Sequence, residues 1–68
     1  MILQPMWKTP PYDEALSTSV VVALVYPDGS EREGWYSGWE GWECVHPTDG
    51  PMLVDADDVE PLGWRMAG

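Results

Sequence analysis

The chain has 68 residues, with twelve acidic residues against three basic ones and a single cysteine. This length predicts one domain, and a lone cysteine excludes an internal disulfide, so packed side chains must supply the core. A net charge of −9 argues against direct binding to nucleic acid or anionic lipid. With 44% hydrophobic and 12% aromatic residues, the composition also argues against an acidic disordered chain.

Membrane and secretory segments are not expected. The longest apolar run covers residues 20–26, far fewer than the roughly 20 residues needed to span a bilayer. The first residues lack a basic stretch followed by a long apolar one. The sequence therefore predicts a soluble protein of the cytoplasm.

The N-terminal part is rich in proline. Three prolines within residues 1–11 predict an extended arm, and residues 12–68 are expected to form a single compact domain. In residues 12–17, "YDEALS", acids follow the prolines directly, which favours at most one short helical turn.

Residues 17–26, "STSVVVALVY", form the clearest predicted element. They are β-branched and apolar at successive positions, which indicates a central strand buried on both faces. "PDGS" at 27–30 predicts a turn, after which residues 30–37 return as the second strand of a hairpin.

The second half of the chain continues with short strands. "SGWEG" at 37–41 ends the hairpin strand. Further strands are predicted at 42–46, 52–55 and 62–66, separated by a turn at 47–51 and by an acidic connection at 56–61 that can hold one helical turn. The expected fold is mainly β, a small antiparallel sheet or partly open barrel of four to five short strands.

Five tryptophans and no phenylalanine make the aromatic residues the main candidates for the core. Trp35, Trp42 and Trp64 each lie in a strand-like segment and are predicted to be core residues. Trp39 lies in the "SGWEG" turn and is expected to be exposed, where it and Tyr36 could contact a partner.

The sequence offers little for catalysis or metal binding. Cys44 and His46 are the only cysteine and histidine; at i and i+2 of a strand they share a face, but their spacing matches no nucleophile–base signature, so packed side chains are predicted. A zinc site needs more such ligands. "DADDVE" at 55–60 lacks the glycine and closing glutamate of a calcium loop. We expect no enzyme activity, no cofactor and no metal.

The acidic residues are concentrated in the middle of the chain. Residues 28–60 hold ten acids and one base, which is −9. Alternate residues of a strand, such as Glu31 and Glu33, lie about 6.7 Å apart on one face, and a DNA strand carries one phosphate per about 3.4 Å. Rows of carboxylates can therefore approximate a phosphate array. The candidate partner-binding acids are Glu31, Glu33, Glu40, Glu43, Asp55, Asp57, Asp58 and Glu60.

In its small size, charge imbalance and lack of enzyme motifs, the chain resembles phage-encoded anti-CRISPR proteins that mimic DNA, in particular small inhibitors of type I-C Cascade. Its outline "W…P…VVALVYPDGSEREGWYSGWEGWEC…EPLGWRM" is similar to that of small phage proteins, apart from residues 44–60. The resemblance implies binding to the basic, PAM-reading surface of a CRISPR effector complex.

Two other classes remain open. One is a protein-interaction module that uses Trp39 and Tyr36 while the acids serve solubility. The other is an aromatic cage for a quaternary ammonium or another small ligand.

Overall fold

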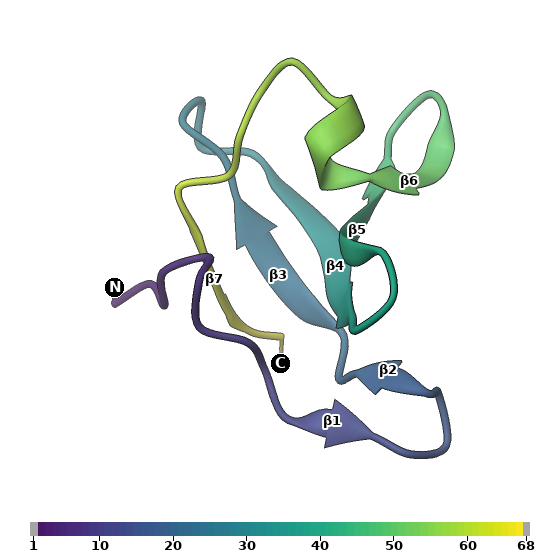
Figure 1. Cartoon of the computed structure of the whole chain (residues 1–68). Helices are drawn as coiled ribbons and strands as arrows, with labels where there is room; N and C mark the ends of the chain where they lie inside the picture. Colours follow the sequence, from purple (N-terminus) through teal and green to yellow (C-terminus); the bar gives the residue numbers. More distant parts are fainter. Residues whose placement is uncertain (1, 68) are drawn as a thin grey trace.

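The computed structural model describes residues 2–67, which form a small β structure (Figure 1). A five-stranded antiparallel sheet has the strand order β6-β5-β4-β3-β7, and a two-stranded hairpin, β1-β2, lies beyond one end of it. A 3-10 helix at Val54–Ala56 is the one helical element among the described residues. The sheet stays open, with β6 and β7 as its edges, so the predicted mainly-β antiparallel sheet is confirmed and a barrel is not formed.

Four strands of the main sheet match predicted segments to within a residue or contain only part of them. However, β6 starts at Gly50, inside the predicted turn at 47–51, and the 3-10 helix replaces the second half of the strand predicted at 52–55. The strands are β3 (Val22–Val25), β4 (Glu31–Ser37), β5 (Gly41–His46), β6 (Gly50–Leu53) and β7 (Gly63–Met66). The turns between them follow the predicted signals, with left-handed backbone at Gly29, Gly41 and Gly50. The chain winds as a meander through β3, β4, β5 and β6, and β7 then pairs with the other edge of β3.

The strand expected over residues 17–26 is interrupted. β3 is buried at Val22 and Leu24 on the core side and at Ala23 on the other face, all at most 9% exposed, whereas Val25 is half-buried. However, Val21 is 39% exposed, and the backbone N–H of Val20 donates to the carbonyl of Pro11 instead of to β4. The first part of the segment is therefore a separate strand, β2 (Thr18–Ser19).

Residues 12–17 belong to a hairpin, and the short helical turn expected there is limited to its loop, where the N–H groups of Leu16 and Ser17 donate to the carbonyls of Asp13 and Glu14. Tyr12–Asp13 is a strand, β1, that pairs with β2. The Asp13 carboxylate accepts the backbone N–H of Ala15, and Ser17 has a left-handed backbone with a φ of 58°. These features are typical of a tight turn between strands.

The core lies on one face of the main sheet. Its buried cluster consists of Val22, Leu24, Tyr26, Cys44, Val54 and Trp64, with Met6, Val20, Trp42 and Met52 packed against it. The connection from β6 to β7 includes the 3-10 helix and passes over the sheet from one edge to the other (Figure 1). Of the three predicted core tryptophans, Trp64 is buried and Trp42 packs at the border. The prediction for Trp35 is wrong, because its side chain points away from this cluster.

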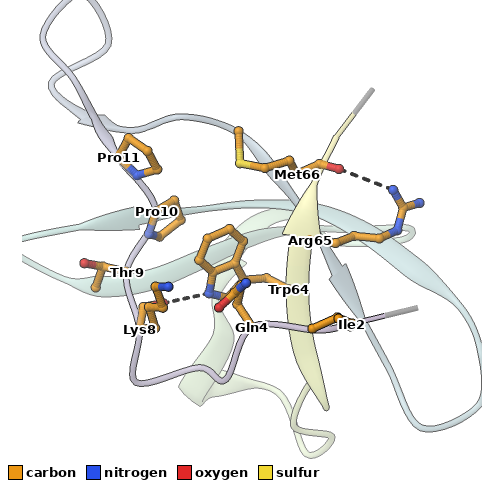
Figure 2. Close-up of a pocket in the computed structure, with 9 residues that line it drawn as sticks. All are labelled: Ile2, Gln4, Lys8, Thr9, Pro10, Pro11, Trp64, Arg65 and Met66. Atoms are coloured by element: carbon orange, nitrogen blue, oxygen red, sulfur yellow. Dashed lines mark hydrogen bonds between the residues drawn. The ribbon is translucent and has the colours of Figure 1, made fainter.

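The N-terminal segment closes the core along β7. The backbones of Gln4 and Trp64 exchange two hydrogen bonds of 2.8 and 2.9 Å. The Trp42 indole N–H donates to the carbonyl of Met6 at 2.9 Å, and that of Trp64 donates to the carbonyl of Lys8 at 2.7 Å (Figure 2). Both indoles thus satisfy their polar group on this segment.

Candidate partner-binding surface

The register of the main sheet sorts the candidate acids by face. Directly paired residues of antiparallel strands share a face, so the partners of buried Val22, Leu24 and Cys44 define the core face. The opposite face, named the open face below, is formed by Ala23, Val25, Glu31, Glu33, Trp35, Glu43, Val45, Leu53 and Arg65. Three of the eight predicted acids therefore project from it together.

Two of the three glutamates of the open face have polar partners. A terminal nitrogen of Arg65 lies 2.5 Å from Glu31, and the carboxylate of Glu43 accepts the indole N–H of Trp35 at 2.5 Å. Figure 2 shows Arg65 and Trp64 on opposite sides of β7, as the register requires. Glu33 is exposed, and no ion pair reaches it from residues 2–67.

Glu40 extends this acidic surface at the β4–β5 turn. A hydrogen bond shared with the Glu43 carboxylate raises the pKa of Glu40 above its usual value, and repulsion by this second negative charge acts in the same direction. Two carboxylates that repel each other would be relieved by a cation placed between them. This end of the open face is thus suited to a lysine or arginine of a partner.

The remaining acids lie on the core side, in and after the 3-10 helix. Asp57 lies 2.5 Å from the guanidinium of Arg32, and both side chains are about 15% exposed. This hydrogen bond lowers the pKa of Asp57, and the guanidinium carbon of Arg32 also lies 4.2 Å from the ring centre of Tyr26. Asp55, Asp58 and Glu60 are exposed. The predicted acids therefore form two groups on opposite sides of the sheet instead of one array.

The two aromatic candidates are also separated. Trp39, at the tip of the β4–β5 turn, is 92% exposed, as expected from the sequence. Tyr36 is half-buried on the core face, where its ring meets that of Trp42 edge to face at 5.5 Å. Tyr36 is therefore a packing residue more than a free contact residue.

Trp35 is a residue of the open face, although its sequence context led to the prediction that it belongs to the core. In "EREGWYS" it stands two residues after Glu33 and four after Glu31, and alternate residues of a strand share a face. This spacing indicates that Trp35 lies on the same face as the glutamates. Val45 and Leu53, which are 37% and 39% exposed on the same face, carried no comparable signal.

A hollow of about 450 Å³ lies beside β7 and is lined mainly by Trp64, Pro10, Pro11 and Met66 (Figure 2). The indole N–H of Trp64 already donates to the carbonyl of Lys8, and Nε of Arg65, another lining residue, is buried without a hydrogen-bond partner. The apolar surface of the hollow is bordered by the polar residues Gln4, Lys8 and Thr9.

The lone cysteine is a packed side chain as predicted, whereas the lone histidine is half-buried and lies at the β5–β6 turn. Cys44 is completely buried, and Nδ1 of His46 accepts the backbone N–H groups of Thr48 and Asp49. Among residues 2–67, no three His, Cys, Asp or Glu side chains are grouped to hold a metal ion.

No family model, curated protein or solved structure matches the chain. The described residues also include no helix that is long and apolar enough to cross a membrane. The surface chemistry is therefore the basis for a functional assignment.

Proposed function

We propose that the chain is a non-enzymatic inhibitor that binds the basic, DNA-binding surface of a nucleic-acid-binding complex in place of DNA. The observation that carries this proposal is the imbalance of exposed charge. Nine of the twelve acids are exposed, whereas both arginines are held in ion pairs with Glu31 and Asp57. The surface is therefore almost purely anionic and would steer a basic partner toward it.

The resemblance to small DNA-mimic anti-CRISPR proteins gives this proposal a specific target. The partner would be the PAM-reading, DNA-binding surface of a type I effector complex, type I-C in particular, in the cytoplasm of a bacterium. Such a complex needs no cofactor on the inhibitor's side.

The test is competition with DNA. Purified type I-C effector complex is titrated with the protein in the presence of fluorescent target DNA, and DNA binding is followed by anisotropy. We expect the protein to displace the DNA, and the inhibition to weaken about tenfold when salt is raised from 0.05 to 0.3 M, estimated from the screening of charge-driven contacts. The double variant Glu31→Lys with Glu33→Lys should inhibit less. Unchanged inhibition by this variant would contradict DNA mimicry.

A second candidate rests on Trp39, which is 92% exposed. An exposed indole at a turn is typical of the contact residues of protein interfaces. In that case Trp39→Ala abolishes binding and salt has little effect, so the salt series separates the two candidates.

A further inference from the structure

The open face of the sheet is buried at Ala23 and Ser37, which are 9% and 7% exposed, but it is left partly uncovered along β5 and β6. The connection between β6 and β7 and the N-terminal segment both pack on the core side, through Val54 and Met6. On the open face, Val45 and Leu53 remain 37% and 39% exposed. A sheet normally buries its apolar face against a second layer, so these side chains leave room for one.

Apolar and acidic side chains alternate across three neighbouring strands of this face. Leu53, Glu43 and Trp35 lie in one row across β6, β5 and β4. One step further along the same register, Val45 of β5 lies beside Glu33 of β4. The result is a chequered surface in which Val45 is the diagonal neighbour of Trp35 and Leu53 and carboxylates lie between these apolar side chains.

The charge of the open face determines which partner fits. Glu31, Glu33 and Glu43 against Arg65 leave −2 (three acids minus one base), and Arg65 is already paired with Glu31. A second copy of this chain would bring like charges together, which costs free energy. A partner with lysine or arginine beside apolar residues is complementary in both respects.

We infer that the open face is the docking surface for a cationic amphipathic helix of the partner protein. Three strands spaced about 4.8 Å apart span about 10 Å, which matches the 10–12 Å diameter of a helix. The apolar side of the helix would cover Trp35, Val45 and Leu53. Its lysines and arginines would reach Glu33 and the Glu40–Glu43 pair. This inference rests on the proposed function for the basic character of the partner.

The probe for this surface is an 18-residue peptide of leucine and lysine with leucine at i, i+3, i+4 and i+7, so that it forms an amphipathic helix. Binding of the peptide is followed by NMR, through changes in the backbone signals of the isotope-labelled 68-residue protein. We expect shifts concentrated at Glu33, Trp35, Glu43, Val45 and Leu53. A scrambled peptide of equal charge should bind about tenfold more weakly, because it keeps the charge attraction and loses the apolar side. Shifts confined to residues 54–60, or equal binding of the scrambled peptide, overturn the inference.

Matched variants separate this surface from the acids on the core side. Glu33→Gln with Glu43→Gln removes two charges while glutamine can still accept the Trp35 indole N–H. It should lower peptide affinity about fivefold, as expected for two exposed charge contacts. The control, Asp58→Asn with Glu60→Gln, removes the same charge from the connection and should change affinity less than about twofold. Equal losses for the two double variants contradict the inference.

The two proposals fail in different ways. If the peptide maps to the open face but the protein leaves DNA binding by the effector complex unchanged, the docking surface stands and the proposed function fails. If the protein displaces DNA and the shifts map elsewhere, the docking surface fails and the proposed function stands.

Discussion

At the scale of single residues, Gly34 is a position where the packed sheet leaves no room for a side chain. A Cβ atom there would lie 2.5 Å from Cδ1 of Leu24 and 3.0 Å from the carbonyl oxygen of Glu43. Because Leu24 is fully buried, it has little space to move. Gly34→Ala should therefore destabilise the protein by about 1–3 kcal/mol, as overpacking does.

Urea unfolding followed by tryptophan fluorescence measures this cost. Gly38→Ala is the matched control, because a Cβ atom at Gly38 meets nothing within 4 Å. Equal stability of the two variants would show that the core accommodates a methyl group between β3 and β4.

The pKa of Tyr26 makes the core sensitive to alkali. Burial, with the adjacent Cys44 thiol as a smaller cause, raises the pKa of Tyr26 to about 12 from 10.0. The unfolded chain loses this proton first, so the contribution to stability is complete below pH 10 and is lost as the pH rises toward 12. The urea concentration at the midpoint of unfolding, measured at pH values below and above 10, should decrease as the pH rises. Tyr26→Phe should flatten this decline; an unchanged slope would mean that other groups cause it.

At the scale of elements, one ion pair attaches the acidic connection to the sheet. The Arg32 guanidinium lowers the pKa of Asp57, so this contribution is present above the ordinary carboxyl pKa and is lost as the pH falls through the lowered value. Asp57→Asn should lower the melting temperature at pH 7. At pH 3 or below, the melting temperatures of the variant and the wild type should differ less. The difference between the two proteins isolates Asp57 from the general relief of charge repulsion. A gap that is constant with pH would contradict this role.

Removal of the N-terminal segment should lower the free energy of unfolding. It supplies four hydrogen bonds to Trp42 and Trp64, two from the backbone of Gln4 and two to the indoles. Deleting residues 1–8 should cost about 4 kcal/mol at roughly 1 kcal/mol per hydrogen bond. Trp64, now 4% exposed, would meet water, and its emission would shift to longer wavelength. An unshifted emission would mean that β7 keeps its cover without the segment.

The sequence predicted β3, β4, β5 and β7 because each combines β-forming residues with clear turn signals. It predicted β6 only in part, because this strand begins with a glycine and a proline that indicate a turn. It did not predict the β1-β2 hairpin, since residues 12–17 lack a glycine turn and depend on the Asp13 side chain and on a left-handed Ser17. Nor could it predict which acids the arginines neutralise. Arg32 and Asp57 are 25 residues apart, and Arg65 and Glu31 are 34 apart, so only the fold brings them together.

At the scale of the whole molecule, the acids are spread over both sides of a body measuring 32 × 28 × 21 Å. In about 0.01 M salt the screening length is about 30 Å, so nearly every carboxylate repels every other; in about 0.1 M salt it is about 10 Å, and only neighbours interact. Self-repulsion in a chain of net charge −9 opposes the compact state. The two arginine ion pairs act in the opposite direction but involve only two of the twelve acids.

Salt should therefore stabilise the free protein. We expect the free energy of unfolding to rise by on the order of 1 kcal/mol between 0.01 and 0.2 M sodium chloride, mostly below 0.1 M. Asp58→Asn with Glu60→Gln should reduce this gain, because it removes two exposed charges. A complex with a basic partner should weaken over the same range, since screening then removes attraction. Opposite responses of the free protein and the complex would indicate that the acids destabilise the fold and serve binding; a free protein that loses stability with salt would contradict this.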